Sequence, residues 1–213
     1  MSIEQILEIA GAASALLLLA GLVIGQLNGE WRIWPAPPVG SLKSFGFWTL
    51  FRTLNVVVLI LGIERFLTTL GGDALPLRIA CAAVSLISGL AYAYALWSLG
   101  RKATYCQASG LATDGVYRWT RNPQYATAIA AFATLGIAAA AWDATLLAAS
   151  LVLVYAMMAR AEEPWLETRY GVSYLDYKAE VPRFFNLRHA AAELSAFVTS
   201  KSPSLAKHLQ TKR

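Results

Sequence analysis

Residues 122–161, NPQYATAIAAFATLGIAAAAWDATLLAASLVLVYAMMARA, decide the fold class. The only charged residues in this stretch are Asp143 and Arg160. A helix needs roughly 20 apolar residues to cross a hydrocarbon core of about 30 Å, so each side of Asp143 is long enough for one span. We expect membrane-spanning helices over 124–141 and 144–161, joined as a tight antiparallel hairpin.

Long uncharged runs continue this pattern along the chain. Ile9–Gly29, Ile79–Gly100 and Asn122–Trp142 contain no Asp, Glu, Lys or Arg. Of the 213 residues, 57% are hydrophobic and 15% are charged, whereas soluble domains average about 45–50% and about 25%. This composition excludes a soluble globular protein, a disordered chain and a disulfide-stapled secreted domain. We expect an all-α integral membrane protein with about five transmembrane helices, at 6–27, 45–63, 77–99, 124–141 and 144–161.

The Lys and Arg residues predict the orientation. With the N-terminus outside, sixteen of the eighteen fall on the cytoplasmic side, and only Arg65 and Arg78 fall outside. Cytoplasmic loops of membrane proteins carry an excess of basic residues. We therefore predict a multi-pass protein of a bacterial inner membrane, with the N-terminus outside and the C-terminus in the cytoplasm.

Composition also limits the partners. Two Cys and two His are too few for a zinc, haem or iron–sulfur site, so we expect no metal. Most basic residues flank the spans, so the net charge of +5 indicates anionic membrane headgroups as partners rather than nucleic acid. Nothing in the sequence indicates an oligomeric state.

A polar segment precedes the fourth expected span. Pro123 suits the first helical turn, where its missing N–H costs nothing, and Asn122 is then the expected N-cap. The free amides of a helix start, flanked by Arg118 and Arg121, suit a carboxylate or phosphate. Positive-inside anchoring with ordinary capping explains the same residues equally well.

Glu162 and Glu163 form a carboxylate pair at the end of the fifth span. Adjacent carboxylates at a membrane boundary repel each other and cost desolvation, which a bound cation would relieve, with Arg160 offsetting part of the charge. The simpler alternative is that Pro164 begins a new cytoplasmic helix with both glutamates at its start. Spacing alone favours this alternative.

Three tyrosines follow the carboxylate pair. Tyr170, Tyr174 and Tyr177 share one face if their segment is helical. They suit either the cover of a nucleobase or contact with the headgroup layer.

Together, these segments resemble a known family. The chain has LxTDGxYRxxRNPxY at 111–125, the glutamate pair at 162–163, YGxxYxxY at 170–177 and VPR at 181–183. This order and spacing resemble the integral-membrane methyltransferases, the superfamily of isoprenylcysteine carboxyl methyltransferase and phospholipid N-methyltransferase. The resemblance implies three parts: N-terminal helices with an interfacial loop (1–79), a methyltransferase core (80–187) and a basic cytoplasmic tail (188–213).

The resemblance also implies S-adenosylmethionine as the cofactor, enclosed by the last two spans and a cytoplasmic C-terminal helical segment. The catalytic residues that it implies are Glu163 and Arg160. The implied cofactor-binding residues are Leu111, Thr113, Gly115, Tyr117, Arg121, Asn122, Pro123, Tyr125, Glu162, Glu163, Tyr174, Tyr177 and Arg183. Asn122 stands where the commoner family motif has His, and Asn cannot titrate near neutral pH, which excludes a histidine base at this point.

The expected function is transfer of a methyl group from S-adenosylmethionine to a lipophilic acceptor within the membrane. The acceptor is an isoprenylcysteine-like carboxylate, a phospholipid amine or a thiol. A sterol- or steroid-reductase-like enzyme that uses NADPH is the alternative, because such enzymes have a similar Arg-x-Pro-x-Tyr element, although they are generally longer. A non-enzymatic membrane scaffold or small transporter is the third possibility, and it would more often show mid-span charges or inverted repeats.

Overall fold

The computed structural model describes residues 1–35, 37–104 and 110–185, and in this part of the chain all regular structure is helical. Cys106 and the basic tail 188–213 lie outside the described residues. Two short 3₁₀ helices and six α-helices follow one another along the chain: α1 (Ile3–Leu27), η1 (Gly29–Trp31), α2 (Leu42–Thr68), α3 (Leu75–Thr104), η2 (Gly115–Arg118), α4 (Pro123–Ala139), α5 (Trp142–Tyr170) and α6 (Val172–Glu180).

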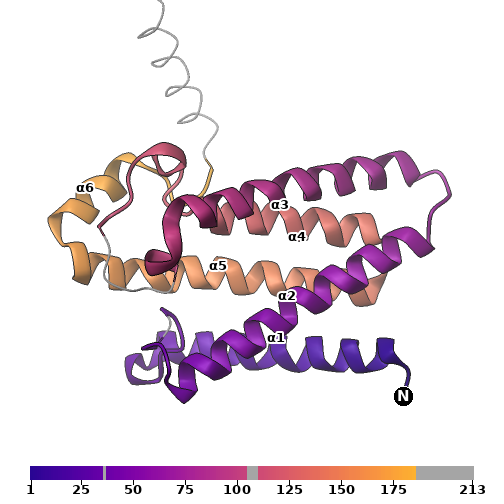
Figure 1. The fold of residues 1–213 in the computed structure, drawn as a ribbon, viewed down its shortest axis with the longest axis horizontal. Coiled ribbons are helices and arrows are strands. Elements are labelled where there is room, and N and C mark those ends of the chain that lie inside the picture. The colour runs from indigo at the N-terminus through magenta and orange to yellow at the C-terminus, as the bar shows by residue number, and fades with distance from the viewer. Residues whose placement is uncertain (36, 105–109, 186–213) are drawn as a thin grey trace, which may run out of the picture.

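The five long helices run back and forth between two ends of a bundle (Figure 1). One end, which we call the site end, carries η1, the segment between α3 and α4, and α6. The other, the far end, carries the N-terminus and the α2–α3 and α4–α5 connections. Helices α3, α4 and α5 lie roughly parallel in the view, while α2 crosses them obliquely.

The expected membrane fold is confirmed. Four helices are long and apolar enough to cross a membrane, namely α1, α2, α3 as far as Gly100, and α5. The remaining expected span is α4, whose 17 residues give a length of about 25 Å at 1.5 Å per residue, near the lower limit for crossing. The hairpin to α5 turns at Ala140, which has the left-handed φ of 52°.

Helix α5 extends further than the sequence predicts. It continues without a break through Pro164 to Tyr170, so Pro164 does not begin a separate helix. Gly171, with φ of +56°, then ends α5 and leads into α6. The glutamate pair therefore projects from the last turns of a membrane helix, directly after the expected end of the span at residue 161.

One apolar core joins α1, α2, α4 and α5. Its most enclosed side chains include Leu18 of α1, Leu54 and Leu61 of α2, and Leu151 and Val154 of α5. Helix α4 packs closely against both α3 and α5 because alanine dominates it, and small residues allow close helix approach in lipid. By contrast, α2 packs on α1, α4 and α5 rather than on α3.

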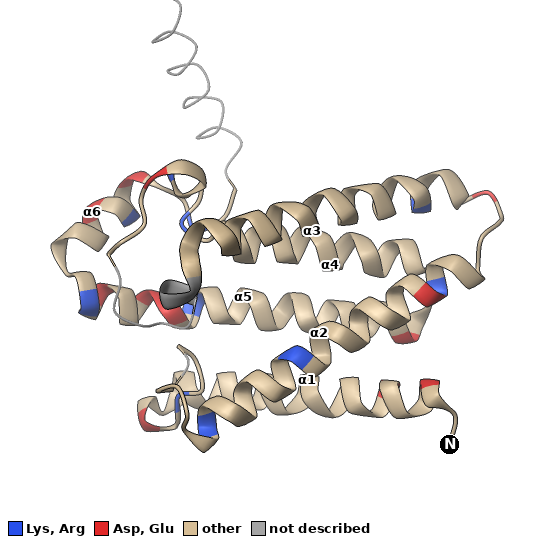
Figure 2. Ribbon diagram, in the orientation of Figure 1, with Lys and Arg blue, Asp and Glu red and all other residues tan. Residues whose placement is uncertain are grey.

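Charged residues gather at the two ends of the bundle (Figure 2). At the far end, the Arg65 guanidinium contacts Asp143 at 2.8 Å, Glu4 at 3.3 Å and Glu8 at 3.4 Å. These contacts fasten α1 and the start of α5 to the end of α2. Arg78 is buried and donates to carbonyl oxygens at the ends of α2 and α4, including Ala138 O at 2.8 Å.

Candidate active site

The start of α4 is fastened to the segment that follows α6. Pro123 occupies the first turn, as the sequence predicts, and Asn122 occupies the N-cap position. The predicted side-chain cap is absent, and the Asn122 side-chain Nδ2 donates to Arg183 O at 3.2 Å. Thr120 Oγ1 donates to the same carbonyl at 2.9 Å, and the Arg121 N–H donates to Pro182 O at 2.9 Å.

Glu163 lies in a cage of cations beside this junction. Arg121 Nη2 donates to its Oε1 at 2.8 Å, while Arg183 donates through Nε at 2.6 Å and through Nη2 at 2.7 Å. Lys178 Nζ lies 3.5 Å away. The carboxylate stabilises the charged form of its partner and raises the pKa of Arg183. Only 5% of the Glu163 side chain is exposed, so its charge is balanced from within the protein.

Arg121 connects three segments of the chain. Besides Glu163 on α5, its Nη1 donates at 2.7 Å to the carbonyl oxygens of Lys178 and Val181. The end of α6 is thereby held against the start of α4. Arg121 and Arg183 thus fix the position of α6, and Glu163 supplies the charge that holds both of them.

A small cavity of about 60 Å³ lies next to this cage, between α4, α5, α6 and residues 110–117. Tyr170, Tyr174 and Tyr177 all face it, although Gly171 separates the first from the other two. Tyr174 is 1% exposed, and its hydroxyl makes no hydrogen bond within the described part of the chain. Burial, reinforced by the charge of Glu163, raises the pKa of Tyr174 to about 12, so this hydroxyl remains a proton donor at neutral pH.

Residues 111–117 form a strap over the small cavity. Gly115 adopts a φ of +62°, which favours glycine, and η2 begins there. Tyr117 points inward and donates to Gln124 Oε1 at 3.2 Å, while the Tyr177 hydroxyl donates to Tyr117 O at 2.6 Å. Burial raises the pKa of both tyrosines above the ordinary value. The strap is therefore tied to both α4 and α6.

Glu162 points away from the cation cage. Its Oε2 accepts a hydrogen bond of 2.6 Å from the Tyr125 hydroxyl. It lines the small cavity and also a second, larger one of about 340 Å³. Leu99 and Gln124 likewise line both. Glu162 is therefore the carboxylate at the junction of the two cavities.

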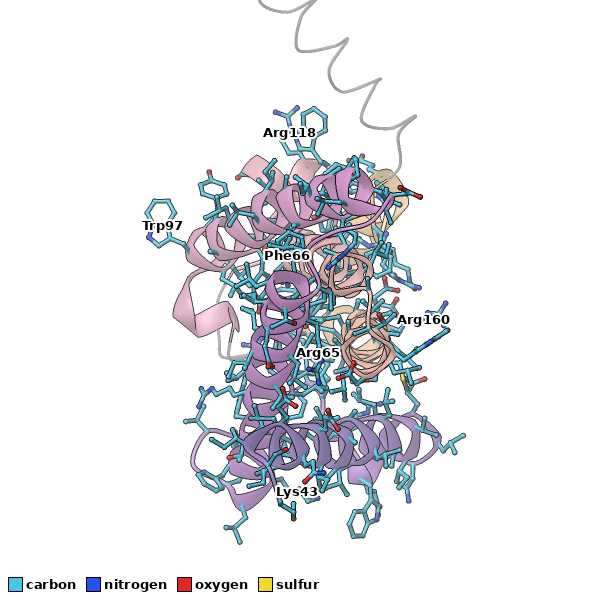
Figure 3. All side chains as sticks on the ribbon, turned by 90° about the vertical axis from the view of Figure 1, so that its right-hand side faces the viewer. Lys43, Arg65, Phe66, Trp97, Arg118 and Arg160 are labelled. Carbon is cyan, nitrogen blue, oxygen red and sulfur yellow. The ribbon has the colours of Figure 1, made fainter. Side chains whose placement is uncertain are left out.

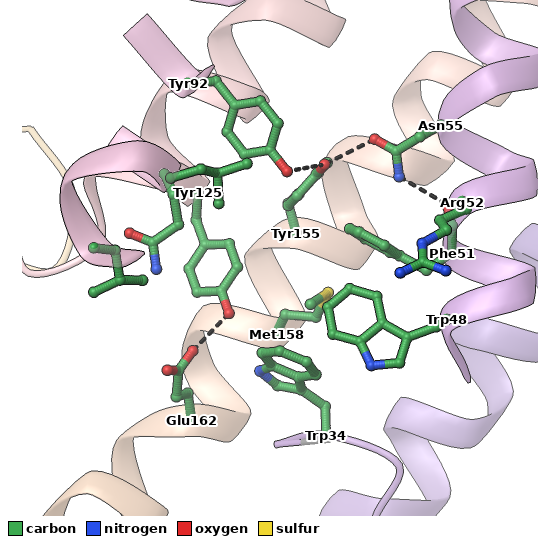
Figure 4. Close-up of a pocket in the computed structure, with 13 residues that line it drawn as sticks. Trp34, Trp48, Phe51, Arg52, Asn55, Tyr92, Tyr125, Tyr155, Met158 and Glu162 are labelled. Carbon is green, nitrogen blue, oxygen red and sulfur yellow. Dashed lines mark hydrogen bonds between the residues drawn. The ribbon is translucent and has the colours of Figure 1, made fainter. Parts of the chain in front are cut away.

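The larger cavity, which we call the aromatic cavity, is built mainly from ring side chains (Figure 4). Trp34, Trp48 and Phe51 form one wall, and Tyr125 and Tyr155 form the other. Trp34 stacks on Phe47 with ring centres 5.1 Å apart and is 4% exposed. The loop after α1, which we expect to lie at the membrane interface, thus buries this tryptophan in the core. The lining also includes Arg52, Asn55, Tyr92 and Met158.

An apolar groove of about 630 Å³ adjoins the aromatic cavity at Asn55 and Tyr92, which line both. Helices α2 and α3 form its walls and α4 its floor, because α2 packs on α4 rather than on α3. At the junction, the Tyr155 hydroxyl lies 2.8 Å from Asn55 Oδ1 and 3.3 Å from the Tyr92 hydroxyl. The groove follows α2 from Asn55 to Phe66, about 16 Å at the rise of an α-helix.

The predicted site residues fall into five groups. The small cavity is lined by Leu111, Tyr117, Arg121, Asn122, Glu162, Tyr174 and Tyr177. The aromatic cavity is lined by Tyr125 and Glu162, and the cation cage holds Glu163 with Arg183. Thr113, Gly115 and Pro123 line neither cavity. Arg160 lies on the other side of α5, in a separate cavity between α1 and α5.

The sequence-based assignment missed several lining residues. Gln124, Trp165 and Leu166 lie within or beside the quoted motifs, but nothing distinguishes them from neighbours that face elsewhere. Arg52 offered a signal, because it is a charge inside an otherwise apolar span. Trp34 offered no such signal, because a tryptophan exposed at the membrane interface and a tryptophan buried in a cavity wall look the same in the sequence.

Comparison with known proteins gives one family. Residues 77–173 match the family model described as phospholipid methyltransferase. No curated protein and no solved structure matches the chain significantly. The matched range contains the strap, the start of α4, the glutamate pair and Tyr170.

Proposed function

Residues 77–173 belong to the membrane methyltransferase family of the isoprenylcysteine and phospholipid methyltransferase type, and from this premise we propose that the protein moves a methyl group from S-adenosylmethionine to a lipophilic acceptor. The observation that carries the proposal is the position of Glu162. Glu162 lines both the small cavity, which tyrosines enclose, and the aromatic cavity, which adjoins the apolar groove.

The chemistry of the small cavity fits the cofactor. S-adenosylmethionine carries an ammonium group, ribose hydroxyls and an adenine ring. Glu162 offers a carboxylate, the buried Tyr174 hydroxyl is an unused donor, and Tyr117 and Tyr177 add ring surfaces. At about 60 Å³ the cavity is smaller than the roughly 300 Å³ or more of typical ligand sites. Binding of the cofactor would therefore require this cavity to widen.

We assign different tasks to the two glutamates. Glu162 would hold the cofactor's ammonium or a ribose hydroxyl and face the reacting groups. Glu163 would be a positioning residue, because its carboxylate is occupied by Arg121 and Arg183. Arg160, on the far side of α5, has no part in this assignment.

The acceptor would occupy the other two hollows. Its reactive group would lie in the aromatic cavity beside Glu162, and its hydrocarbon chain would lie in the groove between α2 and α3. Burial of apolar surface and exclusion of water in such a cavity favour an acceptor of this kind. The Asn55–Tyr155–Tyr92 contact would separate the two parts of the bound molecule.

The bound cofactor would supply a methyl group on a positively charged sulfur. The protein itself would exclude water and align the acceptor. The acceptor atom would approach the methyl carbon from the side opposite the C–S bond that breaks. A carboxylate or thiolate acceptor needs no base. A protonated amine must first lose a proton, and the Glu162 carboxylate, which lines both cavities, would be the group to receive it.

We also propose that the site end faces the cytoplasm, because sixteen of the eighteen Lys and Arg belong to that side in the predicted topology. Reporter fusions at Arg101 and at Arg213 should both report the cytoplasm. A periplasmic or luminal signal from either one would contradict this orientation.

Calorimetry on detergent-purified protein tests the cofactor. S-adenosylmethionine should bind with micromolar affinity, about −8 kcal/mol, and NADPH should not bind. Incubation with labelled S-adenosylmethionine and a total lipid extract should then transfer label to a lipid that gains the mass of one CH₂ group. Binding of NADPH without binding of S-adenosylmethionine would support the reductase alternative and refute the proposal.

A further inference from the structure

A third cavity, of about 240 Å³, lies between α1 and α5 at the site end. Arg32, from the loop after η1, and Arg160, from α5, both line it. Figure 3 shows the Arg160 side chain leaving α5 toward the outside of the bundle. Trp34 lines this cavity and the aromatic cavity, so the indole is the wall between them. We call this third cavity the arginine cavity.

The loop that carries Arg32 is held in place by close packing. A Cβ at Gly25 would lie 3.1 Å from Arg32 Cα, and one at Gly21 would lie 2.6 Å from Ile33 Cδ1. The loop backbone can approach α1 this closely only because Gly25 lacks a side chain, and Gly21 leaves room for the Ile33 side chain. The Asn28 side chain also caps η1, accepting the Glu30 N–H at 3.1 Å. The guanidinium of Arg32 therefore projects from a fixed support.

The arginine cavity carries positive charge without a balancing carboxylate. No Asp or Glu lines it, and neither Arg32 nor Arg160 forms an ion pair or hydrogen bond with any residue that the structure describes. Of the nearby glutamates, Glu162 bonds to Tyr125 and Glu163 to the cation cage, while Glu30 of η1 does not line the cavity. This distinguishes the cavity from the far end, where Arg65 contacts three carboxylates.

We propose that the arginine cavity binds the phosphate of an anionic phospholipid headgroup from the leaflet at the site end. Basic pockets between transmembrane helices bind such headgroups, and guanidinium groups match phosphate oxygens in paired hydrogen bonds. The lipid's chains would lie along α1, whose outward residues Leu16, Leu17 and Val23 are exposed. This lipid is not the methyl acceptor, because Trp34 separates it from Glu162. The inference does not rest on the proposed function.

The test is titration of the purified protein with dioleoyl phosphatidylglycerol, followed by native mass spectrometry. Arg32→Gln and Arg160→Gln should each weaken binding about fivefold, and the double variant about 25-fold, if each arginine contributes as a basic residue near an anionic surface. Arg118→Gln removes an exposed arginine at the site end that does not line the cavity, and it should bind the lipid like the unchanged protein.

Further arms identify the source of the phosphate and guard against misfolding. Arg32→Lys with Arg160→Lys keeps both charges but not the paired hydrogen bonds, so it should bind the lipid more tightly than the Gln double variant and less tightly than the unchanged protein, whereas an unfolded variant would not regain binding. Glycerol phosphate at millimolar concentration should not displace the lipid. Equal lipid binding by the unchanged protein, the Gln double variant and the Arg118 control would overturn the proposal, as would displacement by glycerol phosphate at the lipid's own concentration. Methyl transfer is not measured, so the outcome is independent of the catalytic assignment.

Discussion

Replacing each glutamate of the pair by glutamine separates a structural role from a binding role. Glu163 is 5% exposed and receives three hydrogen bonds from two arginines. Breaking a buried ion pair costs about 3–5 kcal/mol. Glutamine keeps one acceptor oxygen, and Arg183 is 35% exposed. For Glu163→Gln we therefore expect the free energy that holds α6 in place to fall by about 2–3 kcal/mol. That energy corresponds to about a 30- to 150-fold increase in the population with α6 detached.

Glu162→Gln should behave differently. Its remaining oxygen still accepts the Tyr125 hydroxyl, so the free energy of unfolding should change by less than about 1 kcal/mol. The lost charge should weaken S-adenosylmethionine binding about 10- to 100-fold, since hydrogen bonds to charged groups contribute about 1.5–3 kcal/mol.

Two measurements on each variant separate these expectations. Hydrogen exchange of α6 in detergent should rise in Glu163→Gln and stay unchanged in Glu162→Gln, and calorimetry should give the cofactor affinity of each. Glu167→Gln is the matched control, because its half-exposed pair with Lys178 should contribute at most about 1 kcal/mol. If α6 stays protected in Glu163→Gln, the cage does not hold this helix. If Glu162→Gln binds the cofactor normally, the junction between the cavities is not the cofactor site.

Two further substitutions test the packing. Gly62→Ala places a Cβ 2.8 Å from Leu135 Cγ, so it should destabilise the bundle by about 1–3 kcal/mol in a thermal or denaturant melt. In the control Gly46→Ala, the new Cβ meets nothing within 4 Å, so stability should stay unchanged or rise by up to about 1 kcal/mol from helix propensity. Equal melting temperatures for the two variants would contradict close α2–α4 packing. Tyr155→Phe leaves Asn55 Oδ1 without its 2.8 Å donor and should cost about 1–2 kcal/mol; an unchanged melting temperature would show that this contact contributes nothing.

The helices and the position of the motifs were predictable because their signals are local. An uncharged run of the right length indicates a span without knowledge of its neighbours, and Pro123 marks the start of α4 in the same way. The three tyrosines, which the sequence predicts on one face of a helix, all line the small cavity. They line the same cavity despite the break at Gly171 because the Arg121 contacts hold α6 against the start of α4.

The direction in which each charged side chain points was not predictable. Successive residues on a helix lie about 100° apart, so the neighbours Glu162 and Glu163 face different surroundings, while Arg160 and Glu162 face nearly opposite ones. Helix α5 is apolar around most of its circumference, and a sequence of that kind does not reveal its rotation. The partners that settle the rotation, Arg121 and Arg183, come from segments distant in sequence.

The family match covers the residues of the small cavity but leaves out one wall of the aromatic cavity. The small cavity is built from residues within or just beyond 77–173, the range that matches the phospholipid methyltransferase family. One wall of the aromatic cavity comes from Trp34, Trp48 and Phe51, which lie outside that range. On the proposed function, the cavity that would hold the cofactor therefore lies within or just beyond the matched range, whereas the first two helices shape the cavity that would hold the acceptor. On the proposed function, acceptor choice should follow substitutions in this N-terminal wall, and cofactor affinity should not.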